Sequence, residues 1–462
     1  MRRVIDRALR SMAYDVLSRR DHNAGWRAHR AAFLRSSRLS AEALARESDR
    51  ALGEAVRHAY ATSSFYRSAW DAAGVAPGRG FTAADLERLP FLTKEIIRER
   101  RDELCSSAFR RDELIQSLTG GTTGSQTPFF LDRRCAVARL GRQWGVFDLC
   151  GYRPGMRRGL VWGVHLDLPA ADAPFSLKRW FREYATAQET LCCTVLNESI
   201  LGQYYERLCR FDPEVLYGYP SALAQLARFV RDRKLRPPRV RVIMTTAERL
   251  SLAHRRLLAQ VFEAEVFNLY CTREYGCVAF ECREHAGLHV DTGSVYIEIV
   301  RNGRRVPAGV SGEITITDLQ NRGMPFIRSR TGDVGTLSPE PCPCGLPQPL
   351  LKALDGRSAD VVYRPDGSAV AGLMLTDLFA DIPSVRAIQY VQQSPAAIDL
   401  LVVATDSFSQ QDRNAMEREA RTILGAEIQL SIRRVPDIPR NPRSGKIQEI
   451  VNRVTRRAGQ ST

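Results

Sequence analysis

The most informative string of the sequence is TGGTTGS, which lies near position 120. Its three glycines allow backbone N–H groups to approach a ligand closely, and its hydroxyl side chains add further donors. Together they predict a cradle for a polyphosphate, although a P-loop would also need a lysine that this string lacks. A Gly/Thr-rich turn taken alone is more often only a turn, so the prediction depends on the strings that follow. The residues of the cradle are Thr119, Gly120, Gly121, Thr122, Thr123, Gly124 and Ser125.

Three charged residues in later strings are also candidates for a nucleotide site. Glu274 follows a predicted strand, where a carboxylate is suited to hold Mg²⁺. Asp333 ends the string RTGD, and an aspartate at such a turn is able to accept both hydroxyls of a ribose. Lys446 lies in a basic loop that is rich in turn-forming residues and has a glycine directly before the lysine. Each alone is as readily a surface ion pair, a turn or a solvated charge, but the ordered set is hard to obtain by chance.

A second constellation consists of thiols and imidazoles. Cys342 and Cys344 flank a proline in a tight knuckle, and Cys282 and His289 precede it in the chain. Three sulfurs and one nitrogen close a tetrahedral structural zinc site and leave no position open for catalysis. His285 competes as the nitrogen ligand through its Cys-x₂-His spacing, and buried thiols without a metal are the alternative interpretation.

Strand and helix patterns alternate around these strings. Residues 240–246 read as a buried strand, 251–263 as a helix and 266–270 as another strand, and we expect Ser221 to cap the preceding helix. Short links between such elements indicate a parallel sheet, whose ligands lie beyond the carboxyl ends of its strands. Strict alternation over 295–316 predicts antiparallel strands.

The fold class predicted from these patterns is α/β. We expect a large N-terminal domain of mostly parallel sheets flanked by helices, and a small, mobile α+β domain after it. The predicted boundary lies near Gly356, which gives domains of residues 1–355 and 356–462. In the second, the sequence predicts two strands, a helix over 410–424 and a final strand.

Composition narrows the classes of protein. The 462 residues exceed the usual size of a single core, and 67 basic against 52 acidic residues give a net charge of +15. Because the basic residues are nearly all arginine and are spread along the chain, the excess indicates a compositional bias rather than a nucleic-acid surface. No stretch is long enough to span a membrane, and eleven cysteines without an export signal favour a reducing, cytoplasmic location.

The N-terminal segment has the apolar spacing of an amphipathic helix. Its apolar residues include Ile5, Leu9, Met12 and Val16. We interpret it as a surface helix, with a helix that lies on a membrane as the alternative.

The ordered motifs resemble the adenylate-forming (acyl-CoA synthetase-like) superfamily, and within it the phenylacetate–CoA ligase and CapK-like branch. The resemblance covers about residues 48 to 453. Besides the strings above, it rests on GYRPG (151–155), LYGYPS (216–221), TTAE (245–248) and the pair Gly356-Arg357.

The resemblance implies an AMP-forming ligase that uses ATP and Mg²⁺, with a role for each matching residue. Residues 119–125 would grip the β- and γ-phosphates. Thr272 and Glu274 would lie near the α-phosphate and Mg²⁺, and Lys446 would swing in with the small domain as the catalytic cation. The adenine pocket would be formed by Ala247, Glu248, Asn268 and Tyr270, the ribose site by Asp333 and Arg357, and the zinc site by Cys282, His289, Cys342 and Cys344, with the histidine taken from the string GLH.

The acyl pocket is predicted less directly. The candidates are Trp162, His165, Tyr217 and Tyr219, although aromatic residues at strand ends are more often part of a core. If they line a pocket, a flat aryl or arylacrylic acid suits them better than a long fatty chain.

The sequence departs from the phenylacetate-type pattern at two places that bear on the acceptor of the activated acid. Ala359 stands where the branch usually has an acidic hinge residue, and residues 364–367 read RPDG in place of the glycine-centred segment that admits coenzyme A. The acceptor of the activated acid is therefore coenzyme A, another thiol or an amine, and nitrite is an alternative oxyanion for activation. We expect small-molecule partners and a monomer or homodimer. A basic zinc protein that binds nucleic acid and a catalytically silent relative are the competing classes.

Overall fold

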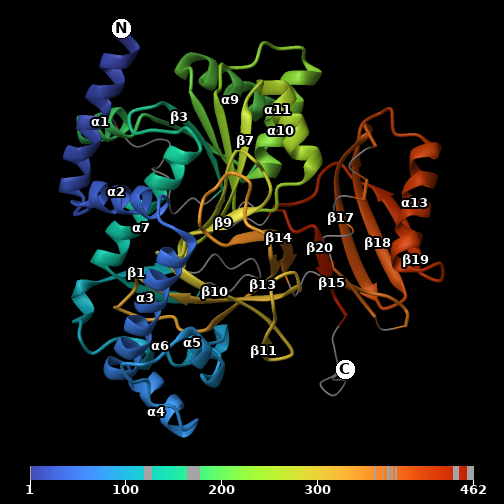
Figure 1. Ribbon diagram of the computed structural model, residues 1–462. Helices are drawn as coiled ribbons and strands as arrows, with labels where there is room; N and C mark the ends of the chain where they lie inside the picture. Colours follow the sequence, from blue (N-terminus) through green and yellow to red (C-terminus); the bar gives the residue numbers. More distant parts are fainter. Residues whose placement is uncertain are drawn as a thin grey trace.

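The computed structural model describes residues 2–118, 127–163, 177–357, 361–366, 368–371, 375, 378–379, 382–440 and 447–454. The cradle of residues 119–125, His165, Ala359 and Lys446 lie outside the described residues, and of Arg357 only the backbone is described. Figure 1 shows a large lobe that ends with β14 and a smaller lobe beside it that contains β17–β19 and α13. Within the described residues, no helix combines the length and apolar character needed to span a membrane.

The N-terminal region is mostly helical. Some of its helices begin at side chains that accept a backbone N–H: Ser40 Oγ accepts from Ala43 N at 3.2 Å, and Thr93 Oγ1 accepts from Ile96 N at 3.4 Å. The elements are α1 (Arg2–Arg20), α2 (Trp26–Ser36), α3 (Ala41–Thr62), α4 (Ser64–Ala72), the 3₁₀ helix η1 (Ala83–Arg88), α5 (Lys94–Glu99), α6 (Arg101–Leu104) and the 3₁₀ helix η2 (Arg111–Glu113). They are followed by a hairpin of β1 (Leu114–Leu118) and β2 (Pro128–Asp132).

A twelve-stranded sheet forms the centre of the large lobe, in the order β11-β10-β12-β13-β14-β9-β8-β7-β6-β5-β3-β4. Five neighbouring strands are parallel: β3 (Arg158–Trp162), β4 (Gln188–Cys192), β5 (Val215–Gly218), β6 (Val242–Thr246) and β7 (Glu265–Thr272). The rest are antiparallel: β8 (Gly276–Glu281), β9 (Leu288–Val290), β10 (Val295–Arg301), β11 (Arg304–Arg305), β12 (Gly312–Asp318), β13 (Ser329–Leu337) and β14 (Leu350–Arg357). The α/β class is confirmed, and the large sheet is mixed.

The parallel strands are covered on both faces, which explains their continuous apolar sequence. In β6, Ile243 packs with Leu223 and Leu258 on one face, whereas Met244 packs with Phe147 and Phe267 on the other. The covering helices are α7 (Arg133–Leu149), α8 (Leu177–Thr186), α9 (Glu198–Phe211), α10 (Pro220–Asp232) and α11 (Leu252–Phe262).

Buried arginines join distant parts of the large lobe. Arg328 on the way into β13 is 1% exposed; it pairs with Glu298 of β10 at 3.0 Å and donates to the Leu89 carbonyl at 2.7 Å. Arg142 of α7 pairs in the same way with the buried Asp291. Such pairs are stable only because every charge has a partner.

The small lobe is an α+β unit, as predicted. Its sheet has the order β19-β18-β17-β20, and the helix α13 (Gln410–Leu424) begins at a capping box between Ser409 and Asp412. The strands are β15 (Val361–Tyr363), β16 (Ala369–Ala371), β17 (Val385–Ser394), β18 (Ala397–Ala404), β19 (Gln429–Arg434) and β20 (Ile450–Asn452). Since β14 runs to Arg357, past Asp355, the boundary between 355 and 356 stays a prediction.

Candidate active site

The predicted adenine-side residues lie at the carboxyl ends of β6 and β7, which are adjacent parallel strands. Ala247 follows β6 with a φ of 69°, a left-handed conformation that turns the chain sharply away from the sheet. The next residue, Glu248, accepts the Ser221 N–H through Oε2 at 3.2 Å. Its Oε1 is buried and has no hydrogen-bond partner among the described residues. Glu248 Oε1 is therefore a buried acceptor at this edge of the sheet that could accept a hydrogen bond from a ligand.

Ser221 corrects one prediction. Helix α10 begins at Pro220 with Tyr219 as its N-cap, and Ser221 is already inside the helix. Proline suits the first helical position because its missing N–H would have no partner there. Glu248, far away in the chain, satisfies the Ser221 N–H, so a serine cap is not needed.

Tyr270 and Asp333, predicted for the adenine and ribose sides, are in direct contact. The Tyr270 hydroxyl donates to Asp333 Oδ2 at 2.6 Å. Burial and the Asp333 carboxylate hold the pKa of Tyr270 well above its ordinary value, so the phenol stays protonated and remains the donor. Asp333 lies opposite Arg357 in the β13–β14 ladder, which brings the backbone of the third predicted residue to the same place.

Asn268 lies two residues before Tyr270 on β7. Its backbone N–H donates to Glu281 Oε2 at 2.7 Å, and its Oδ1 accepts weakly from the Thr245 hydroxyl at 3.5 Å. Four of the predicted nucleotide residues thus lie on or directly after the adjacent strands β6 and β7, and a fifth, Asp333 of β13, contacts Tyr270.

Thr272 is the last residue of β7, and Glu274 lies in the turn that follows it. Thr272 Oγ1 accepts the Tyr275 N–H at 3.0 Å, which closes the loop on itself. Arg139 of α7 donates to the backbone carbonyl of Glu274 and pairs with Asp318 at 2.6 Å. The half-buried Glu274 carboxylate is therefore held on a fixed backbone. Sequence reasoning missed Arg139, because nothing local marks a helix arginine as a partner of a loop far along the chain.

Three of the four predicted acyl-pocket residues, Trp162, Tyr217 and Tyr219, form an aromatic cluster at the ends of β3 and β5. The ring centroids of Trp162 and Tyr219 are 4.8 Å apart, and those of Trp162 and Tyr217 are 5.9 Å apart. Tyr217 and Tyr219 are 6% and 1% exposed, and both pack within hydrophobic cores. Trp162 is half-buried and contacts both clusters. Trp162 is therefore a better candidate for lining a pocket than the two buried tyrosines.

The small lobe reaches this edge through Arg440, which directly precedes the segment that contains Lys446. Arg440 Nη1 donates to Ser221 Oγ at 3.1 Å, beside Glu248. A second contact joins Arg386 of β17 to Asp232 of α10 at 2.5 Å. Sequence reasoning missed Arg440, although its place in the basic loop was a signal.

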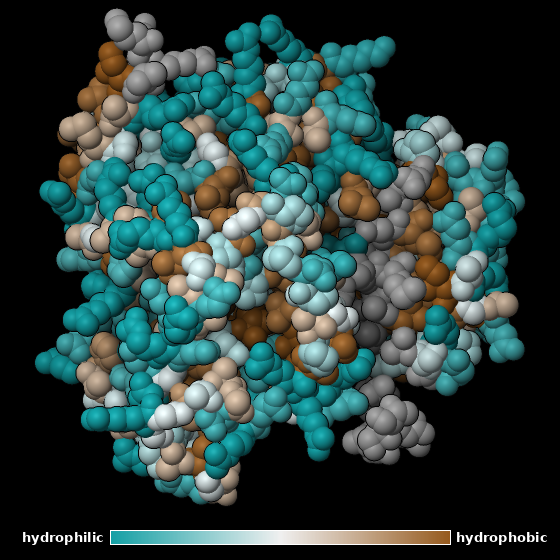
Figure 2. All heavy atoms as spheres, viewed as in Figure 1, coloured by the Kyte–Doolittle hydropathy of each residue, from teal (hydrophilic) through white to brown (hydrophobic). Residues whose placement is uncertain are grey.

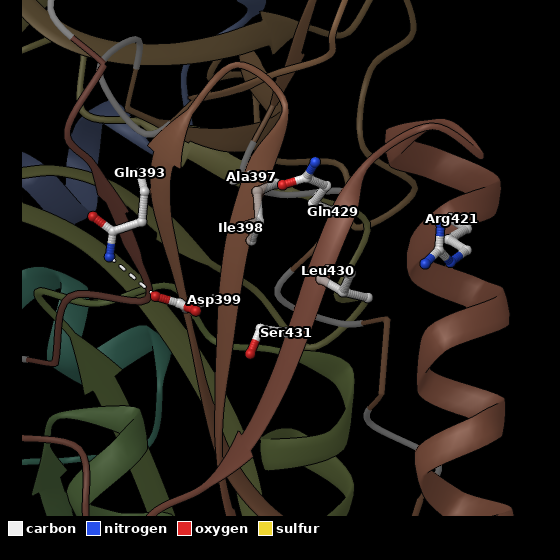
Figure 3. A pocket seen from close by; sticks show the side chains of 8 residues that line it. All are labelled: Gln393, Ala397, Ile398, Asp399, Arg421, Gln429, Leu430 and Ser431. Carbon is white, nitrogen blue, oxygen red and sulfur yellow. Dashed lines mark hydrogen bonds between the residues drawn. The ribbon is translucent and has the colours of Figure 1, made fainter.

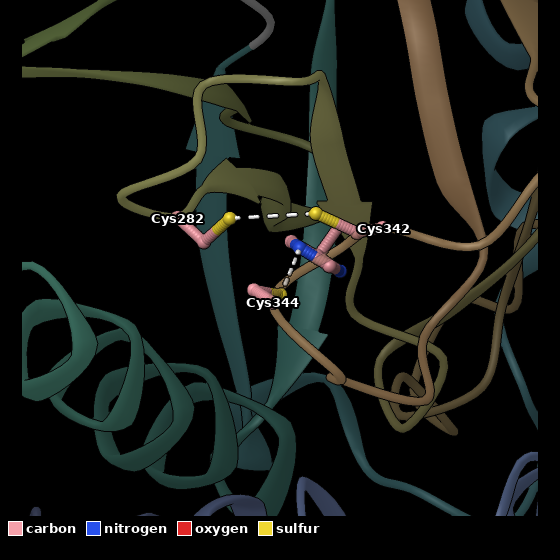
Figure 4. A group of neighbouring side chains, drawn as sticks. Cys282, Cys342 and Cys344 are labelled. Carbon is pink, nitrogen blue, oxygen red and sulfur yellow. Dashed lines mark hydrogen bonds between the residues drawn. The ribbon is translucent and has the colours of Figure 1, made fainter.

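Cys282, His289, Cys342 and Cys344 come together, and their ligand atoms all lie within 4.8 Å of one another (Figure 4). The Sγ atoms of Cys282 and Cys342 are 3.6 Å apart, and Cys344 Sγ is 3.3 Å from His289 Nε2. Burial raises the pKa of the Cys282 thiol to about 12 and lowers the pKa of His289. A bound cation would reverse the first effect, because a coordinating thiol is deprotonated outright.

His285, the competing ligand, lies elsewhere. Its Nδ1 is 3.3 Å from Glu281 Oε2 and 3.2 Å from Arg255 Nη1. The geometry therefore brings His289, and not His285, to the three thiols.

A hollow of about 280 Å³ lies away from these residues, in the small lobe beside the β17–β18 hairpin and α13 (Figure 3). On its rim, Gln393 Nε2 donates to Asp399 Oδ2 at 3.0 Å. Arg421 Nη1 donates to the Ala426 carbonyl, which follows α13. None of the predicted site residues lines it.

Comparisons with known proteins show which proteins this chain is similar to. Residues 362–453 match the family model of the CapK C-terminal domain. Over 386 residues, the chain is 23% identical to protein CapK of Staphylococcus aureus, with 82% of each chain covered. It is 28% identical over 341 residues to phenylacetate–coenzyme A ligase of Thermus thermophilus, covering 70% of this chain and 73% of the relative.

The fold is also that of a solved ligase. A crystal structure of 2-hydroxyisobutyryl-CoA ligase in the postadenylation state matches with a TM-score of 0.71 at 18% identity, over 87% of this chain and 88% of the other. The same ligase in the thioesterification state matches with a TM-score of 0.57 at 21% identity, over 89% and 90%. The relatives and the fold confirm the predicted resemblance and the predicted class of enzyme: this chain is similar to CapK and to the phenylacetate–CoA ligases, and it shares the fold of a solved acyl-CoA ligase.

Proposed function

We propose that this protein joins a carboxylic acid to AMP and then transfers the acyl group to a thiol or amine. The observation that carries the proposal is the contact of Arg440 with Ser221, because it brings the start of the predicted lysine loop against the edge that holds the predicted nucleotide residues. The acid that best suits Trp162 and its neighbours is aryl or arylacrylic.

The residues present fit ATP as the nucleotide. The buried Glu248 Oε1 lacks a donor among the described residues, and the amino group of adenine is a donor. Asp333, oriented by Tyr270, is suited to accept the ribose hydroxyls. The Thr119–Ser125 string, which lies outside the described residues, is proposed to hold the β- and γ-phosphates.

Mg²⁺ fits Glu274, whose carboxylate is a hard oxygen ligand on a backbone fixed by Arg139. When bound, the ion neutralises phosphate charge. Thr272 is proposed to lie beside the α-phosphate.

In the proposed reaction, a substrate carboxylate oxygen forms a bond to the α-phosphorus as the bond to the bridging oxygen of pyrophosphate breaks. Both reactants are anions, so alignment and charge neutralisation decide the rate. Lys446 supplies a cation to both when the small lobe closes. Its departure with that lobe then leaves room for the acceptor.

The experiment that tests this function is pyrophosphate release with ATP and Mg²⁺ against aryl acids, arylacrylic acids, fatty acids, amino acids and nitrite. We expect turnover with an aryl-type acid. Turnover with nitrite alone would identify the alternative oxyanion, and no turnover with any of them would refute the proposal. Binding to duplex or single-stranded nucleic acid that falls steeply with salt, without turnover, would favour the nucleic-acid class instead.

A second candidate for the acceptor has its own support. The family match to the CapK C-terminal domain starts at residue 362 and includes the atypical string RPDG at 364–367. There Arg364 Nε donates to the Ile423 carbonyl at 2.8 Å, which ties the β15–β16 hairpin to the end of α13. A tied hairpin is less able to rearrange for coenzyme A, so an amine or a carrier thiol is the second candidate. Product analysis by mass spectrometry, with coenzyme A, simple amines and no acceptor, decides between them.

The Tyr270–Asp333 contact gives a prediction on ATP affinity. Asp333→Asn is expected to raise KM for ATP by about 10- to 100-fold, because the amide loses the charge-assisted hydrogen bonds that a carboxylate makes. Tyr270→Phe is expected to have a smaller effect in the same direction, since it only frees the carboxylate to rotate. Steady-state kinetics at saturating acid measure both.

Tyr66→Phe is the matched control. Tyr66 is also a buried tyrosine, but its hydroxyl donates to the Pro325 carbonyl at 2.9 Å and not to a predicted site residue. Its KM for ATP is expected to stay within about twofold of wild type. An unchanged KM in Asp333→Asn would remove Asp333 from the ribose site.

The cysteine cluster is proposed to hold one structural Zn²⁺. Three sulfurs and one imidazole fit the ion, and they leave no open position for catalysis. We expect about one equivalent of zinc by mass spectrometry after dialysis. His289→Ala should lose most of it and lower the Tm, whereas the control His285→Ala should keep it. Wild-type protein that is folded but metal-free would refute the site.

A further inference from the structure

The outer face of α1 carries an apolar stripe. Ile5, Leu9, Met12 and Val16 are 53%, 50%, 64% and 57% exposed. Their spacing of four, three and four residues puts them on one side of the helix, over about 16 Å of its length. Figure 2 shows hydrophobic side chains gathered over α1 at the upper left of the molecule. An apolar stripe that faces away from the protein is unusual, since such a stripe normally packs on the core.

The opposite face of α1 is the one that holds the helix to the protein. Leu17 is 4% exposed, and the Tyr14 hydroxyl accepts from Trp144 Nε1 at 3.1 Å. Arg7 pairs with Glu214 at 2.5 Å, and its carbonyl lies so close to Gly155 that a Cβ there would be 2.2 Å away. The helix is therefore fixed with its stripe outward, and rotation to bury the stripe would break all of these contacts.

Helix α8, which lies beside α1, also has exposed apolar side chains. Leu177 and Trp180 are 76% and 52% exposed, and α8 packs against α1. Trp180 stacks on Tyr184 at 5.7 Å, and the Arg10 guanidinium lies 5.9 Å above the Tyr184 ring. An exposed tryptophan beside aliphatic side chains is typical of helices that lie at a lipid–water interface.

The net charge of α1 and α8 distinguishes between two candidates that could cover the apolar side chains, a second copy of the chain and a lipid surface. Helix α1 carries six arginines against two aspartates, and α8 carries three basic residues against one glutamate. A second copy of the chain would bring two basic surfaces together, which is unfavourable. An anionic lipid surface attracts the arginines and takes up the apolar stripe at the same time.

We propose that α1 and α8 form a docking surface for anionic membranes, on which the enzyme lies without spanning the bilayer. Ile5, Leu9, Met12, Val16 and Trp180 would enter the interface between headgroups and acyl chains, and arginines such as Arg19 and Arg20 would contact lipid phosphates. This inference is independent of the proposed reaction.

Flotation of the full chain with vesicles tests the proposal. We expect at least about tenfold more protein bound to phosphatidylcholine vesicles containing roughly a third phosphatidylglycerol than to phosphatidylcholine alone, with binding reduced by salt. Met12→Glu and Leu9→Glu, singly and together, should lower binding by about tenfold or more. Folding is checked by circular dichroism and Tm, which should not change at exposed positions.

Leu252→Glu is the matched control, because Leu252 on α11 is also 64% exposed and the substitution adds the same charge. It should bind vesicles within about twofold of wild type. Equal loss in Leu252→Glu, binding that ignores lipid charge and salt, or no binding to either vesicle would each overturn the proposal. So would a dimer in light scattering that Met12→Glu dissociates, since the stripe would then be an interface between copies.

Discussion

Lys446→Ala is expected to release pyrophosphate about a thousandfold more slowly than wild type, which corresponds to about 4 kcal/mol of transition-state stabilisation. The reason is electrostatic. A carboxylate and a phosphate approach each other as anions, and no other lysine of the sequence lies in the small domain beyond residue 356. The measurement is single-turnover pyrophosphate release at saturating ATP, so that substrate binding does not mask the chemical step.

Lys352→Ala is the control for this prediction, because Lys352 is exposed on β14 and has no proposed role. It should leave the rate within about twofold of wild type. Arg440→Ala is expected to fall between the two, since Arg440 holds the start of the loop through Ser221 rather than touching the reacting atoms. A Lys446→Ala rate within tenfold of wild type would contradict the proposed closure mechanism.

The predictions from sequence succeeded where a local pattern determines the outcome. The buried strands over 240–246 and 266–270 and the helix over 410–424 appear as β6, β7 and α13 with ends shifted by a few residues at most. Apolar periodicity and capping residues act over a few positions, so one sequence contains them in full. The residues around the ends of β6 and β7 then follow, because parallel strands end at a common edge.

Contacts between distant residues could not be predicted in this way. Arg139 holds the Glu274 loop and Arg440 meets Ser221 across the two lobes, yet the surroundings of each arginine resemble those of many others in this arginine-rich chain. The periodicity of α1 likewise identified the residues that share a face but not the face that meets the protein. Only tertiary packing through Tyr14 and Leu17 determines that the stripe with Met12 points outward.

Arg328→Met is expected to cost about 3–5 kcal/mol of the free energy of unfolding. The side chains of Arg328 and Glu298 are 2% and 1% exposed, so the substitution leaves a carboxylate buried without its counter-charge. It also removes the donor to the Leu89 carbonyl, which ties the helical N-terminal region to the sheet. The measurement is urea unfolding followed by tryptophan fluorescence, compared at constant m so that the midpoint reports stability.

Arg330, two residues after Arg328, provides the control. Arg330 pairs with Glu313 at the surface, where its side chain is 52% exposed, so Arg330→Met should cost only about 0–1 kcal/mol. The double variant Glu298→Gln with Arg328→Met is expected to recover part of the loss, because it removes the buried charge but not the cavity. If Arg328→Met and Arg330→Met shifted the midpoint equally, the buried pair would not hold the antiparallel half of the sheet. The loss in the single variant and its partial recovery in the double variant together separate the unpaired charge from the lost packing, and an interaction energy near zero would assign the whole effect to packing.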